Sequence, residues 1–481
     1  MSLAVSDRDL PHRDTSDRDI PDRDIPGRDA SGRDIPHRDT PDRLPDHQRS
    51  PMRFGANYTL GKAWFHGWLD LDLDQVRRDL DGLAALGLDH IRVLPLWDVL
   101  QPNRALVRPA AVADVVAVVD AAHAAGLDAS VDALQGHLSS YDFVPSWLTT
   151  WHRRNLFTDP EALDGQARLV GALGEALAGR PGFLGLTLGN EVPQFAKAAH
   201  PDPRPVTPAE ADAWLARLLE AARAAAPSSR HTHSYDDDVW FVDSSTFTPR
   251  HAVRHGDLLT VHSWVFTGVA HHFPADHPAQ TWFARYLLEL AAAWARSGAA
   301  AGSGAAVRFG DATAAPGTGQ RATTRDTARP LWLQEVGAPV PVLGEERVPA
   351  FAVDTLANAV TMPGLWGVTW WCSHDVDRSL ADFPELEYSL GLLTSDGVPK
   401  PLGKAVRDAL PGLREAAARM PDARAASALA APCDADGRVL RSRTAPGSEF
   451  FAAWVEAAEA GGPPRIELPG GATAVVQEDG R

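Results

Sequence analysis

Apolar segments that resemble strands alternate with amphipathic helical segments along most of the chain, and this alternation constrains the fold more than any other feature. Eight segments have the apolar content and the flanking turn residues of strands. They are residues 53–59, 90–97, 127–134, 183–189, 230–236, 258–264, 330–337 and 365–371. Helical spacing of apolar residues recurs between them, at residues 73–87, 110–126, 160–179, 208–227, 281–298, 350–360 and 399–419. The alternation indicates an α/β fold with a parallel sheet, and eight strands favour a closed (β/α)8 TIM barrel.

An open, doubly wound sheet is the main alternative fold. Such a sheet usually carries a glycine-rich phosphate loop after its first strand. Around the end of the first strand this chain reads GANYTLGKAW, which lacks the GxGxxG spacing. We therefore expect the barrel.

The two ends of the chain differ in composition from the barrel segments. Arginine recurs at every fifth position from Arg8 to Arg43, mostly followed by Asp. A period of five fits neither helix nor strand, so residues 1–51 are expected to be a disordered leader, with Met52 as a candidate alternative start. Residues 52–420 would form the catalytic barrel. Residues 421–481, which contain a Gly-Gly turn signal, would form a small β-rich C-terminal extension.

Composition excludes several classes of function. The formal net charge is −17, and an acidic chain repels phosphate backbones, so no nucleic-acid partner is expected. The two cysteines and the histidines show no zinc-binding spacing, and no apolar run is long enough to span a membrane. The N-terminal MSLAVSDRDL lacks the apolar core of a signal peptide. We expect a cytoplasmic protein without a membrane partner, a metal or a cofactor, and the sequence leaves its oligomeric state open.

Two carboxylates follow apolar strand segments at the positions where a barrel places its active site. Asn190 and Glu191 come directly after the segment 183–189, and Glu335 lies near the end of 330–337. In a (β/α)8 barrel the C-terminal ends of the strands form the active-site face, and the fourth and seventh strands lie across its mouth from each other. Two facing carboxylates are the machinery of glycoside hydrolysis, one as acid/base and one as nucleophile or base.

The segment GLTLGNEVP resembles the Asn-Glu signature of clan A glycoside hydrolases, especially family 5, which includes endo-mannanases and cellulases. The resemblance implies that Glu191 is the acid/base and Glu335 the nucleophile. It also implies that Asn190 hydrogen-bonds the substrate 2-hydroxyl. Arg92, in HIRVLP, resembles the family's second-strand arginine, which keeps the nucleophile ionised.

Two further positions resemble the family, and two depart from it. His262 in VHSW is similar to the sixth-strand histidine, and Trp371 in WWCSHD is similar to the eighth-strand tryptophan that floors the sugar subsite. Val192 separates Glu191 from the proline that usually follows directly. Trp264 stands where the family usually has a tyrosine that hydrogen-bonds the nucleophile, so Tyr235 is a second candidate for that hydroxyl.

Other residues near the predicted strand ends are candidate substrate contacts. The chain has 15 tryptophans against five tyrosines, which suits a sugar-binding cleft because a flat ring stacks on a pyranose. Trp64 and Trp97 are candidate stacking platforms, although either position also suits core packing. His137, after the third strand, is a candidate hydrogen-bonding contact.

These features together predict a retaining glycoside hydrolase that cleaves β-1,4-linked glycans, with mannan or manno-oligosaccharides preferred. A β-glucanase, a cellulase or an exo-β-glycosidase on the same barrel is the nearest alternative. A barrel that binds glycans without cleaving them is an alternative of another class. An aldolase of the Schiff-base type is disfavoured because no predicted barrel strand ends in lysine.

Overall fold

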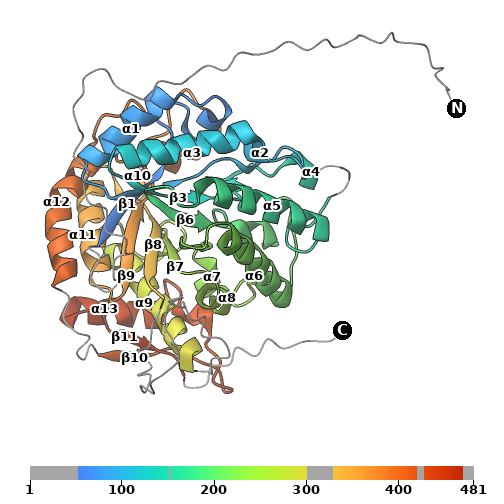
Figure 1. Cartoon of the computed structure of the whole chain (residues 1–481). Helices are drawn as coiled ribbons and strands as arrows, with labels where there is room; N and C mark the ends of the chain where they lie inside the picture. The colour runs from blue at the N-terminus through green and yellow to red at the C-terminus, as the bar shows by residue number, and fades with distance from the viewer. Residues whose placement is uncertain (1–51, 150, 152, 301–328, 420–426, 470–481) are drawn as a thin grey trace, which may run out of the picture. The chain divides into compact units, whose positions relative to one another are not determined.

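Seven parallel strands form the central sheet of the computed structural model, which describes residues 52–149, 151, 153–300, 329–419 and 427–469. The predicted leader, residues 1–51, lies outside the described residues. The strands are hydrogen-bonded in the order β6-β3-β2-β1-β9-β8-β7 (Figure 1). Their bounds are β1 Arg53–Tyr58, β2 His90–Val93, β3 Asp128–Asp132, β6 Phe183–Thr187, β7 Leu259–Ser263, β8 Leu331–Val336 and β9 Leu365–Trp370.

The segment predicted as the fifth strand, residues 230–236, completes the ring between β6 and β7 without forming a regular ladder. On one side, Thr232 N donates to Leu186 O at 2.9 Å, and on the other, Asp257 N donates to His231 O at 2.8 Å. Further backbone bonds lie on the β6 side, where Leu188 N donates to Thr232 O at 2.9 Å. On the β7 side a side-chain hydroxyl contributes, since Thr260 Oγ1 donates to His233 O at 2.6 Å. The predicted barrel is confirmed, and its fifth strand is reduced to a single bridge between Thr187 and Thr232.

Long helices surround the sheet (Figure 1). They are α1 Leu73–Ala85, α3 Pro109–Ala124, α5 Pro160–Leu177, α6 Pro208–Ala225, α9 Ala279–Ala300, α11 Val348–Ala359 and α12 Pro401–Ala418. Helix α6 shows why these segments are helical. Thr207 and Glu210 form a capping box at its start with Pro208 in its first turn, and its buried face includes Trp214 and Leu218. No helix within the described ranges is both long and apolar enough to cross a membrane.

Short elements occupy the connections between strands and helices. The short helices are α2 Trp97–Leu100, α4 Ser146–Thr149, α7 Asp238–Phe241, α8 Pro249–Arg254 and α10 Val340–Leu343. The 3-10 turns are η1 Trp64–Leu69, η2 Val192–Ala196, η3 Val269–His271, η4 Glu385–Ser389 and η5 Arg441–Thr444. A small antiparallel pair, β4 His137–Leu138 and β5 Tyr141–Asp142, follows β3.

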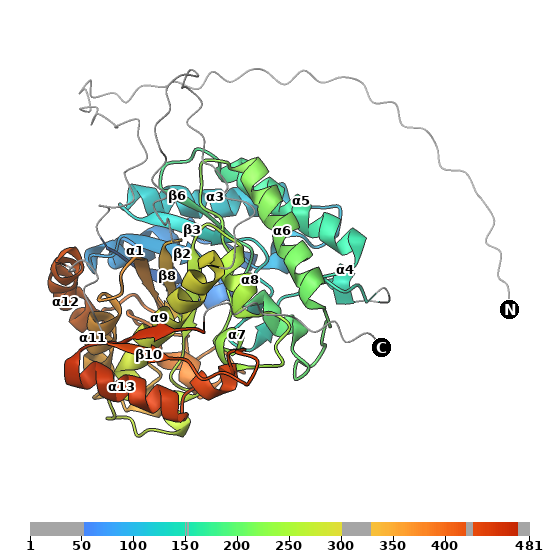
Figure 2. The ribbon, with the colours of Figure 1, turned by 90° about the horizontal axis from the view of Figure 1, so that it is seen from below.

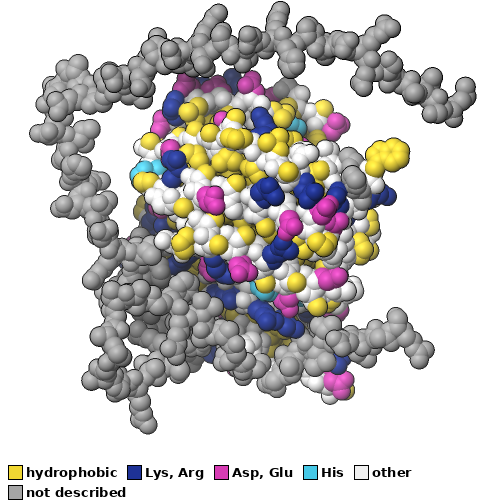
Figure 3. Space-filling model, turned by 45° about the vertical axis from the view of Figure 1, so that its right-hand side comes forward, with side chains coloured by type: hydrophobic (Ala, Val, Ile, Leu, Met, Phe, Trp, Pro, Cys, Tyr) yellow, Lys and Arg dark blue, Asp and Glu magenta, His cyan; other side chains and the backbone are white. Residues whose placement is uncertain are grey.

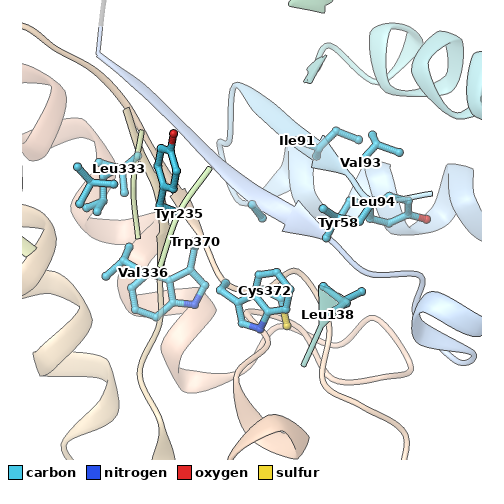
Figure 4. Close-up of a cluster of buried hydrophobic side chains, with 14 of the residues drawn as sticks. Tyr58, Ile91, Val93, Leu94, Leu138, Tyr235, Leu333, Val336, Trp370 and Cys372 are labelled. Atoms are coloured by element: carbon cyan, nitrogen blue, oxygen red, sulfur yellow. The ribbon is translucent and has the colours of Figure 1, made fainter. Parts of the chain in front are cut away.

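Apolar side chains from the strands fill the core. Ile91 and Val93 on β2, Leu333 and Val336 on β8, and Trp370 on β9 are among the buried side chains drawn in Figure 4. On the molecular face shown in Figure 3, positive and negative side chains are interspersed with hydrophobic ones. The strand segments are therefore apolar because they face the interior, and polar residues in them need a separate explanation.

The C-terminal extension differs from its prediction as a β-rich unit. Its longest described element is a helix, α13 Glu449–Gly461, which lies beside the short parallel strands β10 Ala428–Ala430 and β11 Arg465–Glu467 (Figure 2). Ser448 caps the helix, and Phe451 and Trp454 are buried against Tyr286 of α9 at ring distances of 4.9 and 5.1 Å. The apolar spacing in SEFFAAWVEAAEAGG was a helix signal. The predicted Gly-Gly turn lies outside the described residues.

Candidate active site

Polar side chains gather at the C-terminal ends of the parallel strands, which meet at one rim of the barrel. Register places them side by side in pairs: Asn57 of β1 is the partner of Arg92 of β2, and His262 of β7 is the partner of Glu335 of β8. Both ladders of β8 are irregular near Glu335. Such irregularities redirect side chains, and here both Gln334 and Glu335 lie within reach of His262.

Arg92 is the centre of this polar cluster and is fully buried. Its guanidinium donates to both oxygens of Asp132, at 2.9 and 2.6 Å. It also donates to Asn57 Oδ1 at 3.0 Å and to Asn190 Oδ1 at 2.9 Å. The remaining bond, from Nη1 to Glu335 Oε1, is 2.7 Å long. One buried cation thus positions two amides and two carboxylates, and its charge is compensated by them.

Glu335 lies between two permanent donors and one titratable group. Arg92 holds Oε1, Trp264 Nε1 donates to Oε2 at 3.3 Å, and His262 Nδ1 lies 3.4 Å from Oε2. Burial raises the pKa of the Glu335 carboxyl, although the neighbouring His262 and Arg92 charges oppose that rise. The indole of Trp264 therefore does reach the position where the family has a tyrosine hydroxyl.

The chain turns sharply at the end of β6 to bring Glu191 into the rim. Gly189 has φ of 153°, and a Cβ there would meet Leu134 O at 2.3 Å, so only glycine fits. Glu191 itself is left-handed, with φ 42° and ψ 37°. This conformation costs a non-glycine residue about 1–2 kcal/mol. Ser234 Oγ holds it by accepting from Glu191 N at 2.9 Å, and Gln194 N donates to Glu191 O at 2.8 Å.

Glu191 pairs with His262 over a short distance. Its Oε1 lies 2.6 Å from His262 Nδ1, and its Oε2 accepts from Gln194 Nε2 at 3.2 Å. Burial favours the neutral acid, but the protonated imidazole outweighs it and lowers the pKa of Glu191 to about 2. Burial lowers the pKa of His262, whereas Glu335 and Glu191 raise it, and the net shift is upward. The two residues therefore share one proton, which can sit on the imidazole or, across 2.6 Å, on the carboxyl.

The spacing of the two carboxylates limits the chemistry. An oxygen of Glu191, an oxygen of Glu335 and a ring nitrogen of His262 all lie within 4.8 Å of one another. This set could hold a metal ion by distance alone, but Arg92 already neutralises Glu335. A second acidic group, residues 236–238, is held by Lys197, which pairs with Asp236 and Asp238. The rim therefore offers a carboxylate beside a cation and, close to it, a carboxyl with an exchangeable proton.

Comparison with known proteins assigns the chain to a family. A GH5_18 protein from Streptomyces cattleya, solved as a variant in complex with Manβ1-4GlcNAc, is 48% identical to this chain. The match covers 87% of this chain and 94% of that one, with a TM-score of 0.76. The chain belongs to glycoside hydrolase family 5. A GH5_18 protein from Bifidobacterium longum subsp. infantis is 41% identical, with 87% and 92% of the chains covered and a TM-score of 0.75.

A more distant structure shares the fold of this family 5 hydrolase. It is the exo-beta-1,4-mannosidase Op5Man5 from Opitutaceae bacterium strain TAV5, 20% identical, with 86% of this chain and 69% of that chain covered and a TM-score of 0.65. No protein-family model matches the sequence, and no curated protein does.

Trp371 and His137 contact residues that neighbour the two carboxylates of the hydrolase, namely Trp264 and Asn190. Trp371 follows β9 and its ring packs edge-on against Trp264, with centroids 6.4 Å apart. His137 accepts from Asn190 Nδ2 through its backbone carbonyl at 3.3 Å, and its side chain pairs with Asp142 at 3.3 Å. His137 thus positions the Asn190 side chain through a backbone bond. The sequence had predicted only that its side chain would contact the substrate.

Three predicted substrate contacts belong to the core of the hydrolase instead. Trp64 is fully buried, with its indole donating to His374 O at 3.2 Å. Trp97 is fully buried against Trp147 and donates to Gln101 Oε1 at 3.0 Å. Neither has a free ring face for a sugar. Tyr235 packs on His233, and within the described part of the chain its hydroxyl has no hydrogen-bond partner; the bond to Glu335 comes from Trp264.

Three further polar residues of the hydrolase's rim network are not in the sequence-based site. Asn57 donates to Gln334 O and Trp370 O and accepts from Arg92, which ties β1 to β8 and β9. Asp132 is the principal partner of Arg92. Gln334 contacts His262. For Asn57 and Asp132 the signal was available: each is a polar residue at or near the C-terminal end of an apolar strand, the same pattern that identified Glu191 and Glu335.

Proposed function

We propose that this chain is a retaining β-mannoside hydrolase that acts on short β-1,4-linked oligosaccharides such as Manβ1-4GlcNAc. The observation that carries the proposal is the close pairing of Glu191 and Glu335, with oxygens within 4.8 Å of each other. Retaining enzymes place their carboxyl groups about 5–5.5 Å apart, whereas inverting enzymes need about 6.5–9.5 Å. The sugar identity is supported by the Manβ1-4GlcNAc complex of the Streptomyces cattleya relative.

The geometry suits a double displacement. In the first step Glu335 attacks the anomeric carbon and forms a glycosyl ester. The bond to the glycosidic oxygen breaks, and that oxygen takes the proton shared by Glu191 and His262. In the second step Glu191 removes a proton from water, the water oxygen attacks the anomeric carbon, and Glu335 leaves as a carboxylate. Arg92 favours the ionised Glu335 that both the attack and the departure require.

Asn190 is placed to bind the sugar between these two groups. Arg92 and the carbonyl of His137 hold its amide from behind, at 2.9 and 3.3 Å. A preorganised amide of this kind can strengthen its bond to a substrate hydroxyl in the transition state.

The experiment is a substrate panel with product analysis. We expect hydrolysis of Manβ1-4GlcNAc, mannobiose and aryl β-mannosides, slower hydrolysis of aryl β-glucosides, and little release of sugar from polymeric mannan. Proton NMR at early times should show β-mannose as the first anomer. The α-anomer as first product would contradict retention, and rapid depolymerisation of mannan would favour an endo-mannanase instead. Binding of these sugars without any hydrolysis would support the glycan-binding alternative.

A further inference from the structure

A continuous chain of buried polar groups crosses the barrel interior to Glu191. The Thr187 hydroxyl on β6 is close enough to Asp132 to lower the pKa of that carboxyl, against the rise that burial causes. Gln334 Nε2 donates to Thr187 Oγ1 at 3.1 Å, and Gln334 Oε1 lies 3.2 Å from His262 Nε2. His262 Nδ1 then meets Glu191 Oε1 at 2.6 Å. Asp132, Thr187, Gln334 and His262 are fully buried, so the protein alone decides how these bonds point.

The direction of each bond follows from the fixed charge at its far end. Asp132 receives both branches of the Arg92 guanidinium, so it is a carboxylate and only accepts. Thr187 Oγ1 accepts from Gln334 Nε2 at 3.1 Å, which leaves its single proton free to point toward Asp132. This places the NH2 group of Gln334 toward Thr187 and its carbonyl oxygen toward His262. A flipped amide would turn the NH2 group of Gln334 toward His262 and draw the Thr187 proton away from the Asp132 carboxylate.

This orientation fixes the tautomer of His262. The carbonyl of Gln334 requires a proton on Nε2, so Nδ1 has a proton only when the ring is an imidazolium. If the shared proton were lost, the bare Nδ1 lone pair would face the Glu191 carboxylate at 2.6 Å. That repulsion disfavours loss of the proton, so the pair of His262 and Glu191 keeps its shared proton up to a higher pH. The other charged groups around His262, namely Arg92, Asp132 and Glu335, are themselves paired.

We propose that Gln334 is a positioning residue that locks His262 in the Nε2–H form and thereby keeps a proton available to Glu191. Thr187 and Asp132 hold the Gln334 amide in this orientation, so a chain of polar contacts links the Arg92 cluster to Glu191. The inference rests on the proposed function in one respect, because it takes Glu191 to be the acid of the reaction.

The test uses substrates that differ in their need for an acid. Gln334→Met keeps the length of the side chain but removes both of its polar contacts. We expect kcat/KM for Manβ1-4GlcNAc to fall roughly tenfold, while kcat/KM for 2,4-dinitrophenyl β-mannoside, whose leaving group needs no proton, changes little. The basic limb of the pH profile should move to lower pH. Equal losses on both substrates, or an unmoved basic limb, would overturn the proposal.

Two more variants distinguish a loss of His262 positioning from a general loss of core stability. Thr187→Val removes the anchor of the amide and should reproduce both effects in a weaker form. Gln166→Met is the matched control, since Gln166 of α5 is an equally buried glutamine that accepts from Trp214 of α6 and donates to Leu156 O in the loop before α5. It should lower stability without changing the ratio between the two substrates. A changed ratio in the control would count against the lock.

A readout independent of activity distinguishes this inference from the proposed function. In 15N-histidine-labelled protein, the His262 resonances, assigned with His262→Asn, should show a protonated Nε2 throughout the active pH range. A bare Nε2 would overturn the lock even if hydrolysis is normal. If the wild-type protein cleaves neither substrate, the proposed function fails, and the nitrogen shifts of the wild type still decide the tautomer.

Discussion

The two carboxylates of the site are built in opposite ways. Glu335 faces a permanent cation, Arg92, and a permanent donor, the indole of Trp264. Glu191 faces an imidazole whose charge depends on pH. Both carboxylates are buried and lie within a few ångströms of each other, so burial alone does not set their roles. Their partners differ: Arg92 favours a negative charge on Glu335, whereas Glu191 shares a movable proton with His262.

The largest expected effect comes from removing the fixed charge. Glu335→Gln should lower kcat on every β-mannoside by roughly 10⁴-fold or more, because no other group can form the glycosyl ester. The loss should be the same for good and poor leaving groups. Steady-state kinetics on both measure it, with circular dichroism as the control for folding. Activity near that of the wild type would remove Glu335 from the mechanism.

Removing the movable proton should have a more selective effect. Glu191→Gln should lower kcat about 10²–10⁴-fold for a disaccharide. For 2,4-dinitrophenyl β-mannoside the glycosyl ester should form readily and accumulate, because its hydrolysis lacks a base. A burst of dinitrophenol followed by slow turnover is the measurement. A disaccharide rate unaffected by the change would mean that another group supplies the proton.

The cation itself can be altered without removing its charge. Arg92→Lys keeps one positive charge but cannot make five bonds, so it leaves buried acceptors of Asp132, Asn57 or Asn190 unpaired. Each unpaired group costs about 1–3 kcal/mol of unfolding free energy. Denaturant unfolding measures the loss. Arg180→Lys, at the partly exposed Arg180–Asp120 ion pair, is the matched control and should change stability little. Equal effects would mean that the Arg92 network is not stabilising.

The smallest expected effect is a shift in pH dependence. In the wild type, activity should fall as the pH drops through the raised pKa of Glu335, above the ordinary 4.5, because the nucleophile becomes protonated. It should also fall as the pH rises through the raised pKa of His262, above the ordinary 6.5, because the shared proton is lost. Trp264→Phe removes a donor to Glu335 Oε2, so only the acid limb should move upward, by less than about one unit. A shift of the basic limb instead would mean that Trp264 acts on the pair of Glu191 and His262 and not on Glu335.

Strand ends were the most informative feature of the sequence. The apolar runs predicted the barrel, and the polar residues that end them predicted Glu191 and Glu335, because burial of such groups needs a paired site. Arg92 was predicted from the family resemblance. The same rule would have found Asn57 and Asp132. Gln334 is harder to predict, because the irregular ladder of β8 that directs it toward His262 is a property of three dimensions.

Aromatic residues were the least informative feature. Trp64, Trp97 and Trp371 all stand near strand ends and all are buried, but Trp371 alone of the three packs on Trp264, the residue that bonds Glu335. Composition cannot separate a ring that packs under a site from one that lines it, because both positions are rich in tryptophan. The fifth strand was correctly located but not its irregularity, since threonine hydroxyls that replace a backbone ladder look like ordinary strand residues.

The irregular fifth-strand segment, residues 230–236, forms a weakly bonded junction in the barrel wall, called the seam below. Residues 230–236 bond to β6 through backbone groups of Arg230 and Thr232. To β7 they are joined mainly by side-chain hydroxyls, because Thr232 Oγ1 donates to Leu258 O and Thr260 Oγ1 donates to His233 O. Thermal opening of the closed ring should therefore begin there, and amide hydrogens along the seam should exchange with solvent before those of β1 and β2. Ser234 in this segment bonds the backbone of Glu191. Local opening of the seam should therefore displace Glu191 before it displaces Glu335.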